Sequence, residues 1–288
     1  KKLRTYENFE GNLNAILKVG QEAGVPILLS TVGSNLKDCS PFASLHREGL
    51  AAAERFEWHT LFQEGRKQEL AGHYEEALDA YTVATAIDAE YAELQFLIGT
   101  CQLALGEAEQ ARQTFARARD YDTLSVRADS RINRILMDSL PDDEDHVLRI
   151  DAAGALAAQS PEGIPGREMF YEHVHFTVEG NFTLARIIAD QVRTFLSPEI
   201  LESQTEKWLE NEACNRQLAL TEWDQMRLWE EQSQRINTIP FITQTSNPHN
   251  KAHINQQWQK IQARITNNTL NQDQQLYPLA QCLLGVTL

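Results

Sequence analysis

The sequence is poor in cysteine, basic residues and long apolar runs. Its cysteines, Cys39, Cys101, Cys214 and Cys282, lie far apart without a Cys-x-x-Cys pair, which argues against a disulfide framework and a thiolate zinc site. No run of about 18 apolar residues occurs, so we expect no membrane-spanning segment in this chain. Lysine and arginine number 26 against 41 acidic residues, for a net charge of −15. Because phosphate binding needs a basic face, we expect no nucleic-acid partner.

The sequence also lacks an initiator methionine. It opens with KKLRTYENFEGN, which already has the apolar spacing of a helix. We therefore expect further chain upstream of Lys1, together with any targeting segment or membrane anchor. These residues would then be the soluble part of a longer protein, whose compartment the sequence leaves unknown.

With 288 residues the chain is long enough for one large or two moderate domains. Apolar spacing predicts a helix over 5–23, and the run at 25–32 predicts a short strand covered on both faces, as in a parallel sheet. A second strand is expected at 147–152, followed by a Gly/Pro-rich loop at 154–166 and a helix over about 179–195. Strand, inserted helices, strand and closing helix are typical of an α/β domain with an insertion.

A repeat lies between the two expected strands. Small and aromatic residues recur at a step of 34, so that Gly65, Gly72, Ala77, Tyr81 and Ala84 align with Gly99, Gly106, Ala111, Phe115 and Ala118. This pattern resembles the tetratricopeptide repeat, in which a small residue lets paired helices approach and an aromatic fills the gap. Two repeats and a flanking helix are fewer than the roughly three repeats that a free solenoid needs. We therefore expect the repeats to lean on another domain.

The stretch FYEHVHFTVEGN at 170–181 concentrates titratable side chains, and three interpretations fit it. His173 and His175 can be ordinary polar surface or a satisfied structural pair. Alternating histidines on a strand can also share a zinc ion, with Glu172, Asp151 or His146 as third ligand. Finally, Glu172 can accept the Nδ1 proton of His175, three positions later on a tight turn, which leaves Nε2 free to take a proton from a serine hydroxyl.

The last interpretation is favoured by a resemblance. A late strand, a loop, the pattern acid-x-x-His-x-x-x-x-Gly and a closing helix are similar to the last conserved block of the SGNH (GDSL) hydrolases, which are serine esterases and lipases of flavodoxin-like α/β fold. Their block reads Asp-x-x-His, often followed by Pro. Here Glu172 stands for the Asp, Phe176 for the Pro, and Gly180 is retained. The resemblance implies that His175 is the general base and Glu172 its orienting acid.

Four strings together, LLSTVGSNLKDCSPFASLH, the repeats, RADSRIN and GREMFYEHVHFTVEGN, resemble a bacterial subgroup in which tetratricopeptide repeats interrupt an SGNH-like domain. The family's nucleophile is the serine of a Gly-Asp-Ser motif after the first strand, and this sequence has no such motif. Asp129-Ser130 lies in an expected helix, and Gly33-Ser34-Asn35 lies beyond the nucleophile's place in the family. We therefore expect the nucleophile and the oxyanion donors upstream of Lys1, and this chain alone to be inactive on esters.

The loop at 33–42 follows the first expected strand. Because ligands of open parallel sheets bind at the carboxyl ends of the strands, this loop should rim the pocket. Asn35, Asp38 and Ser40 are candidate substrate contacts, with ordinary loop capping as the alternative. The repeats leave from the same edge, so that their groove would lie near the pocket and suit a protein, a peptide or a bulky acyl carrier.

The resulting prediction is a mostly helical α/β chain with a partial flavodoxin-like SGNH domain and an all-α tetratricopeptide insertion. The SGNH-like domain would comprise 1–47 and 140–196, the insertion 48–139 with repeats at about 58–91 and 92–125, and a helical extension 197–288. The predicted function is part of a serine ester hydrolase without cofactor or metal, on an unknown ester. The rival is a non-catalytic interaction scaffold on a degenerate hydrolase domain.

Overall fold

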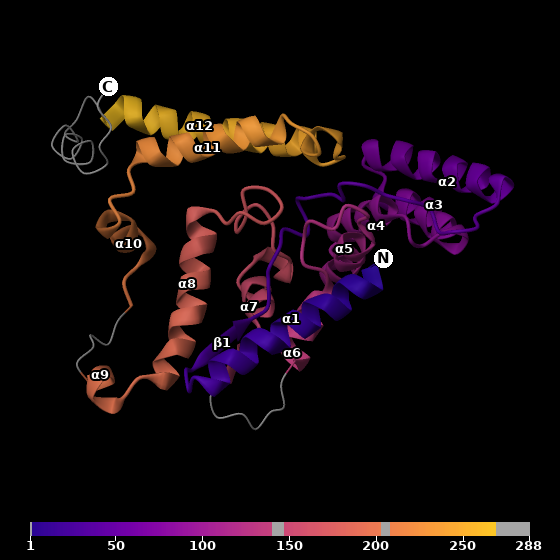
Figure 1. Cartoon of the computed structure of the whole chain (residues 1–288). Helices are drawn as coiled ribbons and strands as arrows, with labels where there is room; N and C mark the ends of the chain where they lie inside the picture. Colours follow the sequence, from indigo (N-terminus) through magenta and orange to yellow (C-terminus); the bar gives the residue numbers. More distant parts are fainter. Residues whose placement is uncertain (1, 140–146, 203–207, 269–288) are drawn as a thin grey trace. The chain divides into compact units, whose positions relative to one another are not determined.

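The structure is a computed structural model that describes residues 2–139, 147–202 and 208–268 (Figure 1). Two compact units, Lys1–Ser203 and Gln204–Leu288, divide the chain. The described residues are mostly helical, as expected, and form one small sheet. Neither the predicted domain boundaries nor a flavodoxin-like hydrolase domain is tested by this architecture, and both stay predictions.

The sheet of the first unit consists of β1 (Ile27–Ser30) and β2 (Val147–Ile150). The two strands pair in parallel, with Ile27 opposite Val147 and Ser30 opposite Ile150, although they are far apart in sequence. Both strands were predicted, and both are shorter than predicted. All four residues of β1 are only half-buried, so that the expectation of full cover on both faces is wrong. A sheet of two strands simply has few neighbours to cover it.

Helices that precede and follow the repeats in the sequence pack on this sheet. Helix α1 (Lys2–Glu22) and helix α6 (Ser130–Asp138) contact β1, and their shared core includes Leu13, Leu17 and Leu136. Helix α8 (Val178–Val192) contacts β2 and continues into a 3-10 turn at Arg193–Phe195, and α9 spans Pro198–Glu202. The helices expected at 5–23 and about 179–195 are thereby confirmed.

The repeat region forms two helical hairpins. The first pairs α2 (Ala52–Leu70) with α3 (Tyr74–Ile87), and the second pairs α4 (Ala92–Ala104) with α5 (Ala108–Tyr121). Gly72 and Gly106 turn the chain within each hairpin at φ of +80° and +82°, a conformation that a side chain would strain. Equivalent glycines therefore make equivalent turns.

The aligned small and aromatic residues meet inside the hairpins. A Cβ atom on Gly65 would overlap the ring of Tyr81, and one on Gly99 would overlap the ring of Phe115. Both rings are almost completely buried. The predicted role of the small residue, which is to let paired helices approach around an aromatic, is confirmed in both hairpins.

The repeats lean on the rest of the first unit, as expected. Leu36 and Ile164, from loops before and after the repeats, pack into the repeat core, and Ile164 is completely buried. The 3-10 turn Pro161–Gly163 contacts α5. Two repeats thus gain the cover that further repeats supply in a solenoid.

The prediction of a loop at 154–166 is wrong for the first part of this range, where α7 (Ala152–Ala158) forms. The carboxylate of Asp151 accepts the backbone N–H of Gly154 at 3.0 Å and caps this helix. Ala152 and Leu156 bury its inner face. A good cap and an alanine-rich turn outweigh the single glycine.

The described part of the second unit, residues 208–268, is mostly helical, as expected for the tail. It contains α10 (Asn211–Gln217), α11 (Glu222–Ile236), a 3-10 turn at Phe241–Thr243 and α12 (Asn247–Asn268). Helices α11 and α12 lie side by side (Figure 1). No helix in the described parts of either unit is long and apolar enough to cross a membrane.

Candidate functional site

The histidine stretch forms a tight turn before α8. Phe170 and Phe176 form an antiparallel bridge with their rings 4.6 Å apart, and the N–H of Tyr171 donates to the carbonyl of His175 at 2.8 Å. Phe170 is completely buried against Leu156 and Met169. The turn between the two phenylalanines is therefore anchored in a core and presents its polar side chains in a fixed arrangement.

Gly180 fixes how this turn joins α8. The hydroxyl of Thr177 caps the helix by accepting the N–H of Gly180 at 3.0 Å, and the N–H of Thr177 donates to the carbonyl of Met169 at 2.9 Å. A Cβ atom on Gly180 would overlap that same carbonyl oxygen. A glycine at this position allows the first turn of α8 to lie directly against the backbone of Met169, which precedes the histidine turn.

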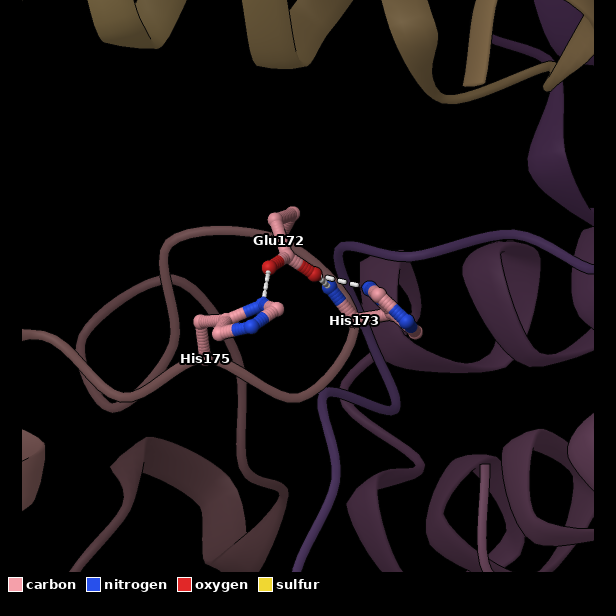
Figure 2. A group of neighbouring side chains, drawn as sticks. All are labelled: Glu172, His173 and His175. Atoms are coloured by element: carbon pink, nitrogen blue, oxygen red, sulfur yellow. Dashed lines mark hydrogen bonds and ion pairs between the residues drawn. The ribbon is translucent and has the colours of Figure 1, made fainter. Parts of the chain in front are cut away.

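Glu172 lies between the two histidines of the turn (Figure 2). One carboxylate oxygen, Oε1, bonds Nδ1 of His175, and the other, Oε2, bonds Nδ1 of His173. Backbone N–H groups of His173 and Val174 also donate to Oε2. A single carboxylate thus holds both rings and the backbone of the turn.

The three side chains differ sharply in exposure. The side chain of Glu172 is 2% exposed, whereas that of His173 is 14% exposed and that of His175 is 50% exposed. The ring of His173 also meets the ring of Phe42 edge-on, with centroids 5.3 Å apart. Of the two histidines, His175 is therefore the more accessible to solvent.

Glu172 is ionised at neutral pH despite its burial. Burial raises the pKa of its carboxyl group, but the hydrogen bonds and charges of His173 and His175 outweigh that effect and lower the pKa to about 2. A neutral imidazole that donates through Nδ1 has its lone pair on Nε2. The arrangement can therefore accept a proton at Nε2 of His175 and stabilise the imidazolium that results.

The loop that leaves the carboxyl end of β1 holds this turn in place. The side chain of Asn35 donates to the carbonyl of Glu172 at 2.8 Å, and its backbone N–H donates to the carbonyl of His173 at 3.0 Å. Asn35 is buried. Glu172 and His173 thus lie against the loop that follows β1, which the sequence predicts to rim a pocket.

Two other candidate residues of this loop are also engaged within the protein. Asp38 pairs with the guanidinium of Arg167 and accepts its backbone N–H, and the N–H of Asp38 donates to Asn35 Oδ1. Ser40 is completely buried. Contact of Asn35, Asp38 or Ser40 with a substrate stays a prediction.

The metal interpretation finds the same cluster. Among the described residues, Glu172, His173 and His175 are the His/Cys/Asp/Glu group whose potential ligand atoms all lie within 4.8 Å of one another. Asp151 instead accepts from Thr31 and caps α7, and His146 lies outside the described residues. Since the carboxylate lies between the two rings, the arrangement fits a hydrogen-bonded acid–base cluster without rearrangement (Figure 2).

Two serines were considered as nucleophiles, Ser130 and Ser34, and their surroundings differ. Ser130 begins α6, where Asp129 is the N-cap, and its hydroxyl accepts from Arg119 at 2.7 Å. The Ser34 hydroxyl is buried and has no hydrogen-bond partner in the part of the chain that the structure describes. Neither residue is placed against His175 by a hydrogen bond among these residues.

Sequence reasoning missed three residues near the cluster: the ring of Phe42 meets His173, Asp122 accepts the N–H of Phe42, and Arg127 donates to the carbonyl of Asn35. Asp122 stands 34 residues after Asp88, at the same position of the second repeat, and both carboxylates are buried. The recurrence of this aspartate in the sequence could have been used as a signal. A carboxylate at the same position of both repeats, if buried, needs a hydrogen-bond partner.

Comparison with known proteins bears on the repeats. Residues 70–130 match the tetratricopeptide repeat family, a span that includes α3, α4 and α5. No curated protein and no solved structure matches the chain. Repeats of this family generally bind other proteins, whereas the resemblance to SGNH hydrolases gains no support from these comparisons and stays a prediction.

Proposed function

We propose that the turn at 170–181 is the acid–base half of a serine-type ester hydrolase, with His175 as general base and Glu172 as its orienting acid. The observation that carries this proposal is the buried, ionised carboxylate of Glu172 bonded to Nδ1 of the half-exposed His175. The SGNH resemblance supplies the reaction class.

The chemistry follows from that hydrogen bond. A serine hydroxyl attacks the acyl carbonyl of an ester while Nε2 of His175 takes its proton. The imidazolium then returns the proton to the leaving alcohol, which departs and leaves an acyl-serine. Water then attacks the acyl-serine while Nε2 of His175 takes one of its protons, and the imidazolium returns that proton to the serine oxygen as the acid is released. Throughout, Glu172 stays ionised and stabilises the imidazolium.

His173 has a different part in this proposal. Its ring is largely buried against Phe42 and shares the carboxylate with His175. It therefore acts on His175 through Glu172, as a positioning residue. The attacking serine is taken from upstream of Lys1, as the resemblance implies, since the sequence has no Gly-Asp-Ser motif.

The test compares the two histidines in the protein expressed from its complete reading frame. With p-nitrophenyl acetate as substrate, we expect His175→Gln to lower kcat/KM by roughly 10²–10⁴-fold, the usual contribution of a general base. His173→Gln is the matched control and should cost much less. Unchanged turnover in His175→Gln would exclude this histidine as the base. Serine-dependent turnover by residues 1–288 alone would place the nucleophile inside this chain.

A second candidate function is protein binding without catalysis, which is favoured by the repeat match at 70–130. A groove of about 520 Å³ lies at the start of α2 and is lined by His46, Leu50, Ala52, Arg55, Phe56 and His59. Phe56 is 76% exposed there and offers an apolar contact. A photoreactive amino acid at position 56 would test this function: a scaffold cross-links a partner equally well in parent and His175→Gln protein, and a protein without a partner at this groove cross-links none.

A further inference from the structure

Two buried aspartates at equivalent repeat positions hold one extended segment, which we name the strap and define as residues 42–47. Asp88 follows α3 and Asp122 follows α5, and they are 1% and 2% exposed. Both lie at the end of a repeat hairpin. The repeats therefore bind a part of their own chain through the same residue type at the same place.

Each aspartate binds one end of the strap. Asp122 accepts the backbone N–H groups of Phe42 and Ala43 at 2.9 and 3.1 Å. Asp88 accepts the N–H of Arg47 at 3.1 Å and bonds Nδ1 of His46 at 2.8 Å. These bonds are charge-assisted, which makes them stronger than ordinary backbone pairs.

Two routes lead from Asp122 to the candidate site. In the first, Asp122 fixes the backbone of Phe42, whose ring meets the ring of His173 edge-on. In the second, Arg127 pairs with Asp122 at 3.3 Å and donates at 2.9 Å to the carbonyl of Asn35. Asn35 in turn holds the backbone of the histidine turn.

Arg127 makes the second route rigid. Its side chain is 3% exposed, and it also donates to the carbonyl of Cys39 at 2.9 Å. A buried guanidinium that loses its carboxylate partner is left uncompensated, so that it must shift or draw in water. Any such shift would move the carbonyl of Asn35, and with it the loop that pairs with the histidine turn.

Asp88 lacks both routes. Among the described residues its carboxylate bonds His46 and Arg47, at the far end of the strap, and the backbone N–H of Glu90. The two aspartates are therefore matched in burial, charge and repeat position, and they differ in whether their partners reach the candidate site.

We propose that Asp122 is a positioning residue for the Glu172–His173–His175 cluster, and that the second repeat sets the geometry of this cluster through the strap and Arg127. The proposal rests on the proposed function only for the chemistry assigned to the cluster. It makes the repeats part of the site's construction, because they hold the histidine turn in place through Phe42 and Asn35 of loop 33–42.

The test uses the full-length protein labelled with ¹⁵N-histidine, which gives few signals because residues 1–288 contain 8 histidines. Two readouts are followed: the imidazole ¹⁵N shifts of His173 and His175, and, by mass spectrometry on unlabelled protein, the hydrogen exchange of the backbone around Asn35. We expect Asp122→Asn to move both imidazole signals and to speed exchange at Asn35 by roughly tenfold or more, the effect of weakening a hydrogen bond to a charged group.

Asp88→Asn is the matched control. We expect it to move the signal of His46 and to lower the melting temperature, as Asp122→Asn does, but to leave His173, His175 and Asn35 unchanged. A purely structural role would give the two variants the same pattern. Equal effects of both variants on His173, or no effect of Asp122→Asn, would overturn the proposal.

Phe42→Leu and Arg127→Lys decide the question where Asp122→Asn fails to fold. The first keeps the backbone N–H and an apolar side chain but removes the ring contact with His173, and the second keeps the charge but loses the fork that spans Asp122 and Asn35. Movement of the His173 signal in either variant supports the proposal, and its absence in both overturns it. None of these readouts involves an ester. A failure of this proposal can therefore be distinguished from a failure of the proposed esterase function, which is tested with His175→Gln.

Discussion

The repeat hairpins and the histidine turn are stabilised in opposite ways. The hairpins share one apolar core in which Tyr81 and Phe115 fill the space left by glycines close in sequence. The histidine turn has a small apolar anchor and depends on polar partners such as Asn35, about 137 residues away in sequence. Apolar contacts tolerate small displacements, whereas buried polar groups lose much of their stabilisation when one partner moves. The second kind of support fits a site whose geometry has to be fixed.

The largest effect in this comparison is expected from the repeat core. Phe115→Ala removes a ring that is 1% exposed and leaves a cavity beside Gly99. We expect a loss of about 3–5 kcal/mol in the free energy of unfolding, measured by urea denaturation. Phe56→Ala, which removes an aromatic that is 76% exposed on α2, is the control and should change stability little. Similar losses in both variants would contradict the packing described.

The next effect concerns Glu172 and acid. Its pKa in the folded protein is about 2, below the ordinary 4.5, so its ionised form stabilises the fold at neutral pH. That contribution, of about 3 kcal/mol, is fully present above about pH 4.5 and is lost as the pH falls through 2. We expect the parent protein to lose more stability than Glu172→Gln between pH 5 and pH 2, measured by urea denaturation at each pH. Parallel curves for the two proteins would show that the carboxylate is not held by the histidines.

A third effect tests how the turn joins its helix. Gly180→Ala places a Cβ atom on the carbonyl oxygen of Met169, and we expect it to cost about 1–3 kcal/mol by overpacking. Gly11→Ala in α1 is the matched control, because no atom lies within 4 Å of a Cβ atom there. It should leave stability unchanged or raise it by up to about 1 kcal/mol, since alanine favours helix. Thermal melting of both variants distinguishes the two glycines, and a harmless Gly180→Ala would contradict the close approach.

The same contrast explains what the sequence could predict. The repeats were readable because each close contact, such as Gly99 with Phe115, is local and recurs at a fixed step. The pair of Glu172 and His175 was readable because three positions on a tight turn suffice to join them. Arg127 could not be assigned in the same way, because its partners, Asn35 and Cys39, are far away in sequence and follow no period. Helix α7 was missed because Gly154 was given more weight than the cap at Asp151.

The smallest expected effect sharpens the comparison between buried and exposed charge. Glu109 in α5 resembles Glu172 in one respect: hydrogen bonds from Arg112 and Gln113 lower its pKa to about 2. It differs in being on the surface, where water screens both partners and the side chains remain free to part. We therefore expect Glu109→Gln to leave the melting temperature unchanged at physiological salt, although Glu172→Gln lowers it. A drop for Glu109→Gln as large as that for Glu172→Gln would mean that burial is not what gives the carboxylate of the histidine turn its effect.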